Sequence, residues 1–375
     1  MLDLKRQYQP LHKELLEALG QVLETQQFIL GRPVAAFERE AAEQLGVAHA
    51  VGCSSGTDAL WLMLAAAGIG PGAAVVTTPF SFFASVSAIL RAGATALLAD
   101  IDPVTFNLSP AGVEQVLAGE KGKQVRAVLP VHLYGQPAAF FPDFGRKHGV
   151  LVLEDAAQAW GAESGGVKAG ALGDAAAFSF YPTKNLSAAG DAGMVTTKSD
   201  ELAERARMLR QHGMRRRYFH DEIGWNTRLD GFQGAVLSVK LRYIEHWNQA
   251  RRAVAERYHA LFRAAGLAEA GPYPQHGLVL PQETAGTRHV WHQYVVRTAR
   301  RDELRAFLTE RKIGSEIYYP VPLHMQDALK CLGYAEGSFP EAERAAREVL
   351  ALPIFPELRE DEQQTVVAAI AEFLS

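Results

Sequence analysis

Two hydrophobic patterns alternate along the first part of the chain. Short, mostly apolar runs such as Ala74–Thr78, Ala96–Ala99 and Val125–Val131 are typical of buried strands. Helix-like runs near Phe82–Arg91 and Phe140–His148 separate them. Strands that alternate with helices in this way predict a mostly parallel sheet in an α/β domain.

A different pattern begins at Arg228. From there to Phe262, apolar positions recur at helical spacing, which predicts a long helix that bridges to a second domain. We therefore expect a large domain at residues 1–240, including an N-terminal segment, and a small C-terminal domain at residues 241–375. No internal repeat or low-complexity tract interrupts this organisation.

Composition agrees with two domains and excludes several classes of protein. The chain has 375 residues, 48% of them apolar, which is ample for one large and one smaller domain. A net charge of -4 gives no electrostatic reason to expect a nucleic-acid partner. Charged residues interrupt the apolar stretches before they reach membrane-spanning length, and no secretory signal pattern opens the chain. We expect a soluble, cytoplasmic protein without a membrane partner, in which Cys53 and Cys331 are free thiols.

Two segments supply chemically opposite groups. Val150–Leu153 is a strand-like run that delivers Asp155 at its carboxyl end, the edge at which open α/β sheets bind ligands. Ala175–Phe180 is a second such run, and the break at Pro182 places Lys184 on the following loop. A carboxylate can hold a pyridine nitrogen protonated, and a desolvated lysine can form a Schiff base with an aldehyde. These are the two protein contacts that pyridoxal phosphate chemistry requires.

The sequence also offers a site for the phosphate of that cofactor. The strand-like run Ala48–Val51 turns through small residues into the helical run Ala59–Ala67. Backbone N–H groups at that helix start, with the Ser55 and Thr57 hydroxyls, form an anion site to which Ser179 could add a hydroxyl. Each feature alone has a structural explanation, because small-residue turns cap helices and an isolated lysine is usually solvated. Their occurrence together at strand-to-loop junctions favours one cofactor site.

The chain resembles the sugar aminotransferases of the DegT/DnrJ/EryC1/StrS group over nearly its whole length. This group belongs to the fold-type I, aspartate aminotransferase-like enzymes that use pyridoxal 5'-phosphate (PLP) and its pyridoxamine form. The resemblance implies a large domain with a seven-stranded type of sheet flanked by helices, and a smaller α/β domain. The matching segments are Leu2–Lys5, Phe28–Gly31, Ser55–Leu60, Glu154–Gln158, Lys184–Leu186 with Gly190–Gly193, and Gly224–Asp230.

The resemblance assigns a role to each site residue. Lys184 would form the Schiff base and move the proton between the substrate carbon and the cofactor, and Asp155 would pair with the pyridinium nitrogen. The other implied contacts are Gln158 at the phenolic oxygen, Gly56, Thr57 and Ser179 at the phosphate, Phe82 stacked on the ring, and Asn226 at the phosphate of the partner subunit. The last contact implies a homodimer with shared active sites. From the residues alone, Phe82 could instead be a core aromatic, and Asn226 a turn residue.

The implied reaction moves an amino group from L-glutamate to a nucleotide-diphosphate-linked keto-sugar. The Asn226–Asp230 segment resembles the form usual among enzymes that act at C3, so we expect a 3-keto sugar, with C4 as the alternative. Arg228 and the stiff aromatic segment with Tyr318, Tyr319 and His324 are candidates for substrate binding. For that segment, a packing role between domains is equally open.

Other functions remain open on the sequence. A sugar dehydratase of the same fold resembles this chain but has histidine at the lysine position, and a non-catalytic regulatory relative would be expected to lose Lys184 or Asp155. A nicotinamide-dependent oxidoreductase should carry a GxGxxG turn after its first strand, and none follows Val51. No HExxH pair or clustered carboxylate set predicts a metal site.

Overall fold

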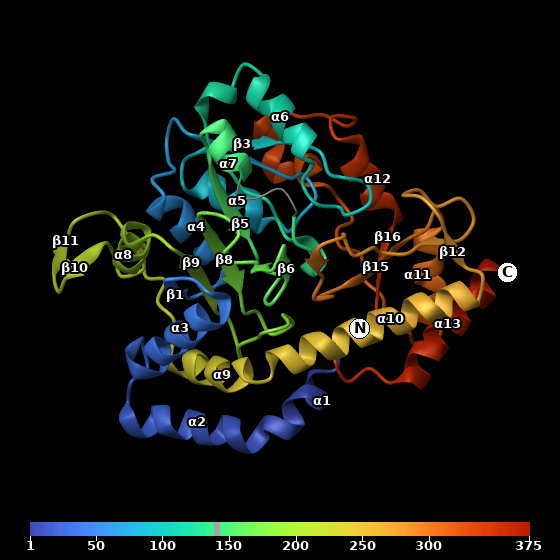
Figure 1. The fold of residues 1–375 in the computed structure, drawn as a ribbon, viewed down its shortest axis with the longest axis horizontal. Helices are drawn as coiled ribbons and strands as arrows, with labels where there is room; N and C mark the ends of the chain where they lie inside the picture. The colour runs from blue at the N-terminus through green and yellow to red at the C-terminus, as the bar shows by residue number, and fades with distance from the viewer. Residues whose placement is uncertain (139–142) are drawn as a thin grey trace.

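The computed structural model describes residues 1–138 and 143–375, and its centre is a seven-stranded sheet (Figure 1). The strand order is β1-β9-β8-β5-β4-β2-β3, in which β9 runs against both of its neighbours and the other pairs are parallel. The mostly parallel sheet predicted from the sequence is confirmed. Its strands are β1 His49–Cys53, β2 Ala74–Thr77, β3 Thr95–Leu98, β4 Val125–Val128, β5 Leu151–Asp155, β8 Ala175–Ser179 and β9 Gly193–Thr197.

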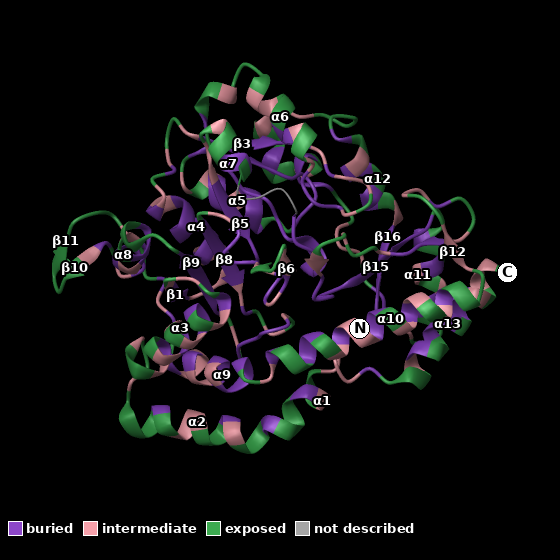
Figure 2. Cartoon of the chain, in the orientation of Figure 1, coloured by how far each residue is buried: buried purple, intermediate pink, exposed green. Residues whose placement is uncertain are grey.

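Alternate residues of the central strands face opposite helical layers. In β8, Ala175 and Ala177 join one hydrophobic cluster, and Ala176 and Phe178 join another. The first cluster includes residues of α4 (Gly56–Ala66), α5 (Ala84–Arg91) and α8 (Asp200–Leu209), and the second includes residues of α3 (Gly31–Leu45) and α9 (Gly231–Leu241). Figure 2 shows the buried strands between helices whose outer faces are exposed. Because both faces of the sheet are covered, its strands read as apolar runs instead of alternating polar and apolar residues.

Helices cover the sheet, and the N-terminal helix α2 (His12–Thr25) packs against α9. The long predicted helix from Arg228 to Phe262 is divided into α9 and α10, and the chain between them is Arg242 and Tyr243. The predicted helix at Phe140–His148 is observed as α7 from Asp143 onward, and its first residues lie outside the described part of the chain. The helices of this part are α1 Leu4–Tyr8, α2 His12–Thr25, α3 Gly31–Leu45, α4 Gly56–Ala66, α5 Ala84–Arg91, α6 Pro110–Ala118, α7 Asp143–His148, α8 Asp200–Leu209 and α9 Gly231–Leu241.

A smaller, four-stranded sheet lies at the C-terminal end of the chain. Its strand order is β12-β13-β15-β16, formed by Ala268–Glu269, Leu278–Val279, Tyr294–Arg297 and Val349–Leu352. The helices with it are α10 Ile244–Ala264, α11 Arg301–Glu310, α12 Pro340–Glu348 and α13 Glu360–Leu374.

The helix α10 belongs to both parts of the molecule. Ile244 and Trp247 near its start pack into the cluster of the large sheet, whereas Tyr258 and Phe262 near its end pack with the small sheet (Figure 1). This bridge agrees with the helix expected from the sequence. A domain boundary at residues 240 and 241 stays a prediction, because the helix that follows it contributes to both hydrophobic clusters.

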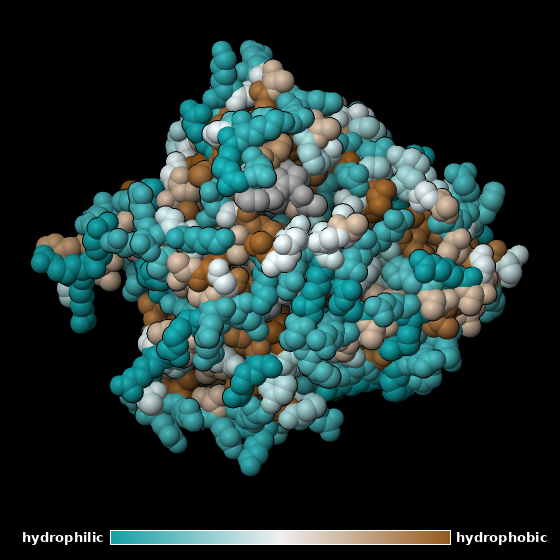
Figure 3. Space-filling model, viewed as in Figure 1, coloured by the Kyte–Doolittle hydropathy of each residue, from teal (hydrophilic) through white to brown (hydrophobic). Residues whose placement is uncertain are grey.

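Two short sheets complete the fold. One is the three-stranded sheet β14-β6-β7, formed by Thr287–Arg288, Glu163–Ser164 and Val167–Lys168. The other is the hairpin β10-β11, formed by Met214–Arg216 and Phe219–His220, which projects from the body at the left of Figure 1. Figure 3 shows the same projection standing clear of the rest of the surface.

Candidate active site

The sheet brings the predicted site residues to one edge. The strands β1, β2, β5 and β8 run in the same direction, so their carboxyl ends lie along this edge. Since β9 runs the other way, its first residue, Gly193, pairs here with both Cys53 and Ser179. Asp155 is the last residue of β5 and pairs with Ala177, two residues before Ser179. The carboxylate and the predicted phosphate contacts therefore come from neighbouring strand ends, the usual ligand site of an open α/β sheet.

Asp155 is buried and held by hydrogen bonds. Its Oδ2 accepts a hydrogen bond from the Ser85 hydroxyl at 2.7 Å, and its Oδ1 accepts one from the Ala157 backbone N–H at 3.2 Å. Burial raises the pKa of Asp155, and these hydrogen bonds and the charge of Lys184 act in the opposite direction. A protonated ring nitrogen placed against this carboxylate would oppose the effect of burial further.

Lys184 lies on the loop that follows β8, as predicted. Its backbone N–H donates to the Tyr181 carbonyl at 2.8 Å, which closes a turn after the strand. Burial lowers the pKa of Lys184 to about 8, and the nearby charge of Asp155 acts against this shift. Within residues 1–138 and 143–375, the side chain of Lys184 has no hydrogen-bond or ion-pair partner. The amine is therefore desolvated, unpaired and close to an acid, which suits a nucleophile or proton carrier.

The residue after the lysine is fixed by the rest of the fold. The Asn185 side-chain amide donates to the Val290 carbonyl and to Asn248 Oδ1, both at 2.9 Å. Its Oδ1 lies 3.2 Å from Nδ1 of the buried His292, whose pKa burial holds well below its ordinary value. A neutral imidazole can donate its Nδ1–H to this oxygen. The lysine loop is thereby fastened to α10 and to the segment before β15.

The predicted phosphate site is a close contact between two chain segments. A Cβ added to Gly56 would lie 2.5 Å from Ser179 Cβ, and one added to Gly193 would lie 2.2 Å from the Ser55 carbonyl oxygen. Ser55 caps α4 by accepting the Asp58 N–H at 3.1 Å, so the N–H groups of Gly56 and Thr57 lie in the unpaired first turn. A helix start with free N–H groups beside a serine hydroxyl fits a phosphate. The residues present therefore fit PLP.

Gln158, Tyr319 and Phe82 form one side of this site. The Gln158 amide accepts a hydrogen bond from the Tyr134 backbone N–H at 2.6 Å and donates one to the Tyr319 hydroxyl at 3.3 Å. The ring of Phe82 lies 6.3 Å from that of Tyr319. Phe82 is 58% exposed, whereas Phe80, in the same apolar segment, is fully buried. The core position belongs to Phe80, and the Phe82 ring is free to meet a ligand.

The remaining substrate candidates are divided between two places. Arg228 pairs with Cys53 beside the phosphate turn, and its Nε is buried without a hydrogen-bond partner in the described chain. The Tyr318 carbonyl accepts a hydrogen bond from the Tyr134 hydroxyl. His324 lies elsewhere: its side chain is fully buried and its Nε2 lies 2.9 Å from Glu343. The structure thus brings Arg228 and Tyr319 to the site but not His324, whose role in substrate binding stays a prediction.

Asn226 is exposed, although its neighbours are fixed. The Ser54 backbone N–H donates to the Thr227 carbonyl at 3.1 Å, and Asn226 itself pairs with Gln211 in an isolated bridge. Asn226 follows the projecting hairpin in the chain, and its side chain is exposed. The contact with a partner subunit that the resemblance implies stays a prediction.

Sequence reasoning missed the hydroxyl and backbone groups that orient the predicted side chains. Ser85 binds Asp155, and the Tyr134 N–H binds Gln158. Lys240 of α9 donates to the carbonyl and hydroxyl of Ser187, three residues after Lys184. In the sequence, Ser85 and Lys240 are polar residues on otherwise apolar helix faces. Such a pattern indicates a buried polar contact, but it does not identify the partner.

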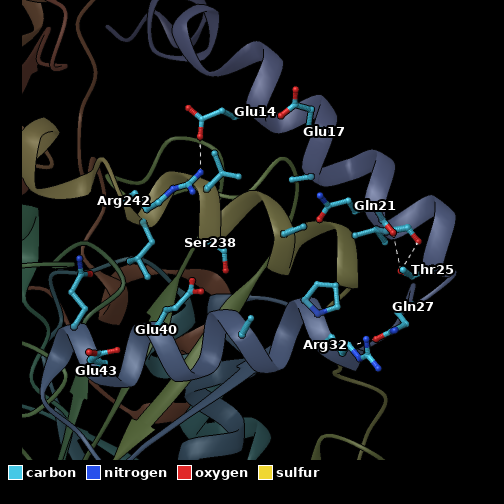
Figure 4. Close-up of a pocket in the computed structure, with 18 residues that line it drawn as sticks. Glu14, Glu17, Gln21, Thr25, Gln27, Arg32, Glu40, Glu43, Ser238 and Arg242 are labelled. Atoms are coloured by element: carbon cyan, nitrogen blue, oxygen red, sulfur yellow. Dashed lines mark hydrogen bonds and ion pairs between the residues drawn. The ribbon is translucent and has the colours of Figure 1, made fainter.

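A groove of 980 Å³ lies away from this site, between α2, α3 and α9 (Figure 4). Glu14 and Gln21 of α2 face it from one side and Glu40 of α3 from the other. Arg242, directly after α9, binds Glu14 across it. In the described part of the chain, no three His, Cys, Asp or Glu residues are placed to hold a metal ion. No helix among the described residues is long and apolar enough to cross a membrane.

Comparison with known proteins identifies the family. The sequence profile of the DegT/DnrJ/EryC1/StrS aminotransferase family matches residues 9–371. A pleiotropic regulatory protein of Geobacillus stearothermophilus is 47% identical over 375 residues, which cover 100% of this chain and 98% of the relative. A UDP-N-acetyl-3-dehydro-α-D-glucosamine 3-aminotransferase of Acidithiobacillus ferrooxidans is 40% identical over 380 residues, with 100% and 97% covered.

A solved structure shows the same fold. The crystal structure of DesV from S. venezuelae in complex with a ketimine intermediate matches with a TM-score of 0.93 at 42% identity, covering 100% of this chain and 97% of that one. The chain therefore belongs to the DegT/DnrJ/EryC1/StrS aminotransferase family. This confirms the family, the fold class, the class of enzyme and the PLP cofactor that the sequence predicted.

Proposed function

We propose that the protein moves an amino group from L-glutamate to C3 of a nucleotide-diphosphate-linked 3-keto sugar, as a step in the biosynthesis of deoxy-amino sugars. The observation that carries this proposal is the desolvated, unpaired Lys184 beside the hydrogen-bonded carboxylate of Asp155, at the sheet edge where Gly56 and Ser179 meet. PLP would supply an electron sink for the carbon that loses or gains a proton. The protein would supply the orientation and the proton transfers.

Each side chain has a defined task in this reaction. Asp155 would hold a proton at the ring nitrogen of the cofactor, and the first turn of α4 with Ser179 would anchor its phosphate. Lys184 would take a proton from the α-carbon of the amino acid and would return a proton to the cofactor. Burial lowers its pKa to about 8, so a neutral fraction exists near neutral pH to accept that proton.

Two observations support the position of amination. The relative from A. ferrooxidans is named a 3-aminotransferase that acts on a 3-dehydro sugar. The chain also carries Asn226-Thr227-Arg228-Leu229-Asp230, which resembles the form usual in C3 enzymes. Amination at C4 of the sugar is the second candidate.

Exposed apolar residues on the projecting hairpin support a homodimer. Tyr218 is 75% exposed, Phe219 55%, and Ile223 in the following loop 85%. Side chains of this kind, grouped on a projection, are typical of a subunit interface. The hairpin leads to Asn226, the residue that the family resemblance places at the cofactor phosphate of the partner subunit. Such a contact would make each active site depend on both subunits.

The regulatory and dehydratase alternatives have weaker support. One relative is named a pleiotropic regulatory protein, but this chain keeps both Lys184 and Asp155, which regulation alone does not need. A dehydratase of this fold would have histidine in place of Lys184. A cytoplasmic location, expected from the sequence, stays a prediction.

The visible absorption spectrum of the protein incubated with PLP tests the donor half of the reaction. We expect a band from the bound cofactor that L-glutamate converts to that of the pyridoxamine form, and no such cycle in Lys184→Ala. Lys13→Ala, which changes an 89% exposed lysine, is the matched control and should behave as the unchanged protein. A band that glutamate leaves unaltered would contradict the proposal. Product analysis with nucleotide-linked 3-keto and 4-keto sugars then distinguishes C3 from C4.

A further inference from the structure

A chain of two buried serine hydroxyls ends on Asp155. Ser85 Oγ lies 2.7 Å from Asp155 Oδ2, and Ser81 Oγ lies 2.9 Å from Ser85 Oγ. Ser81 is 3% exposed, Ser85 0% and Asp155 4%. Water therefore has little access to these three side chains, and the geometry alone limits how their protons are arranged.

The directions of the two hydrogen bonds follow from counting donors. An ionised carboxylate is an acceptor only, so the single O–H of Ser85 must point at Asp155. The hydroxyl of Ser85 then accepts, and the O–H of Ser81 must point at Ser85. Both hydroxyl dipoles are thereby aligned toward the carboxylate, and hydrogen bonds in such a chain strengthen one another. The other oxygen of Asp155 takes the Ala157 N–H at 3.2 Å, so both oxygens are held.

We propose that Ser85, supported by Ser81, is a positioning residue that fixes the plane of the Asp155 carboxylate and keeps it an anionic acceptor for the ring nitrogen of the cofactor. This inference rests on the proposed function, and it assigns Ser85 a part in it without contact with the reacting atoms. Burial raises the pKa of Asp155, and the charges of Lys184 and His132 act to lower it. Ser85 adds a neutral donor at hydrogen-bond distance in a site where burial favours protonation.

The placement of Ser85 joins two functions of one segment. Ser85 lies in the first turn of α5, and Phe82 and Ser81 lie just before that helix. The same segment is fastened to the aromatic loop, because the Leu323 N–H donates to the Pro79 carbonyl at 2.7 Å. Residues 79–85 thus carry both Phe82, which is exposed to a ligand, and Ser85, which orients the Asp155 carboxylate. The Ser85 hydroxyl is the polar contact between this segment and Asp155.

The test compares variants that differ only in the hydroxyl. Ser85→Thr keeps the hydroxyl, and Ser85→Val has nearly the same shape without it. Both variants are larger than serine to the same extent, so crowding affects them equally. Ser85→Ala removes the hydroxyl without added volume. Ser87→Ala is the control on the same helix, since among the described residues Ser87 Oγ donates only to the Ala84 carbonyl, at 3.4 Å. Ser81→Ala removes the outer hydroxyl and leaves the Ser85 bond to Asp155 in place.

The measurement is the ¹⁵N chemical shift of bound cofactor labelled at its ring nitrogen, together with the dissociation constant of the cofactor. We expect the nitrogen to be protonated in the unchanged protein, Ser85→Thr and Ser87→Ala. In Ser85→Val and Ser85→Ala the shift should move toward the unprotonated value, with the cofactor bound on the order of 10-fold more weakly. Ser81→Ala should change both in the same direction by less, and it carries the test if the Ser85 variants do not fold.

These variants distinguish failure of the positioning role of Ser85 from failure of the proposed function. If Ser85→Val keeps the shift and affinity of Ser85→Thr, the positioning role is wrong while the proposed aminotransferase reaction is untouched. If the unchanged protein binds no PLP, the proposed function fails, and this inference fails with it.

Discussion

At the scale of single residues, burial shifts the pKa values of Lys184 and Asp155 in opposite directions. It lowers the pKa of the Lys184 amine to about 8 and raises that of the Asp155 carboxyl. Both shifts favour the uncharged form, as burial in a low-dielectric site does. The two groups respond differently, because Asp155 is held by two donors while Lys184 has no partner in the described chain. The acid is thereby kept as a fixed anion and the amine as a mobile base.

The first prediction concerns the pH at which Lys184 reacts. The rate at which apoprotein captures PLP covalently should rise with pH and reach half of its plateau near pH 8, because only the neutral amine attacks and burial lowers its pKa from 10.5 to about 8. Stopped-flow absorbance over a pH series measures this rate. A rate that keeps rising toward pH 10.5 would show an ordinary, solvated lysine. Lys184→Ala should show no capture at any pH.

A second prediction concerns the glycine at the phosphate turn. Gly56→Ala places a Cβ 2.5 Å from Ser179 Cβ, so the helix start must move away from the serine. We expect PLP to bind at least about 10-fold more weakly and the free energy of unfolding to fall by about 1–3 kcal/mol. Gly20→Ala in α2 is the control: its Cβ would meet nothing within 4 Å, and we expect stability to rise by up to about 1 kcal/mol. Equal PLP affinity in the two variants would contradict the predicted phosphate site at Gly56.

Local patterns made some residues predictable and left others hidden. Lys184 and Asp155 follow apolar strands directly, so the sequence itself shows that they lie at strand ends. Ser85 is 70 positions from Asp155, and no local pattern records their contact. His324 stood in a motif with two tyrosines, yet its ring points to Glu343 in a fully buried pair. Which side of a loop a residue occupies depends on tertiary packing, which spacing does not reveal.

At the scale of elements, the division between α9 and α10 shows the limit of periodicity. Apolar spacing continues through Arg242 and Tyr243, and no proline or glycine marks the break. Both residues instead bind Glu14 of α2, at 2.6 Å for the guanidinium and 2.5 Å for the phenol. Contact with the N-terminal helix thus accompanies the change of direction. The sequence predicted helix correctly on both sides, but the partner that fixes the break lies 228 positions away.

The third prediction tests how α9 holds the lysine loop. Lys240 Nζ donates to the Ser187 carbonyl at 2.8 Å and to its hydroxyl at 2.7 Å. Lys240→Met leaves these groups without their donor, so the free energy of unfolding should fall by about 1–3 kcal/mol. Denaturant titration measures it, with Lys13→Met as the exposed control.

The pH dependence of that stability has a definite sign. Burial lowers the pKa of Lys240 from 10.5 to about 8. Between these two values the unfolded chain binds more protons at this position than the folded one, so the contribution of Lys240 to stability rises with pH. Lys240→Met should remove this rise, and Lys13→Met should keep it. An identical pH profile in Lys240→Met and the unchanged protein would show that the amine titrates normally.

At the scale of the whole molecule, the order of motifs predicted the family and the large sheet, but not the outline of the molecule. The charged segment from Arg215 to His220 belongs to a hairpin that stands clear of the body (Figure 1). Its aromatic side chains Tyr218 and Phe219 are largely exposed. A single copy of the chain leaves Asn226, which follows this hairpin in the sequence, exposed.

The fourth prediction asks whether Asn226 serves its own active site or that of a second copy. Lys184→Ala removes the base, and Asn226→Asp places a negative charge against the phosphate, so each variant alone should be inactive or nearly so. Co-expressed with different tags and purified through both, they give a dimer that carries one of each. If Asn226 reaches across the interface, both changes fall in one of the two sites and the other site is intact.

The outcome depends on whether each active site contains residues of one chain or of both. If Asn226 reaches the site of the other chain, the two-fold dimer should recover about half of the activity of the unchanged protein, because one of its two sites contains an unaltered Lys184 and an unaltered Asn226. If Asn226 served its own chain, each site would carry one defect and no activity would return. Pairing Lys184→Ala with Lys13→Ala should also give about half of the activity, since the exposed Lys13 lies outside both sites. A purified protein that yields no doubly tagged species would contradict the dimer itself, and with it the proposal that two chains build each active site.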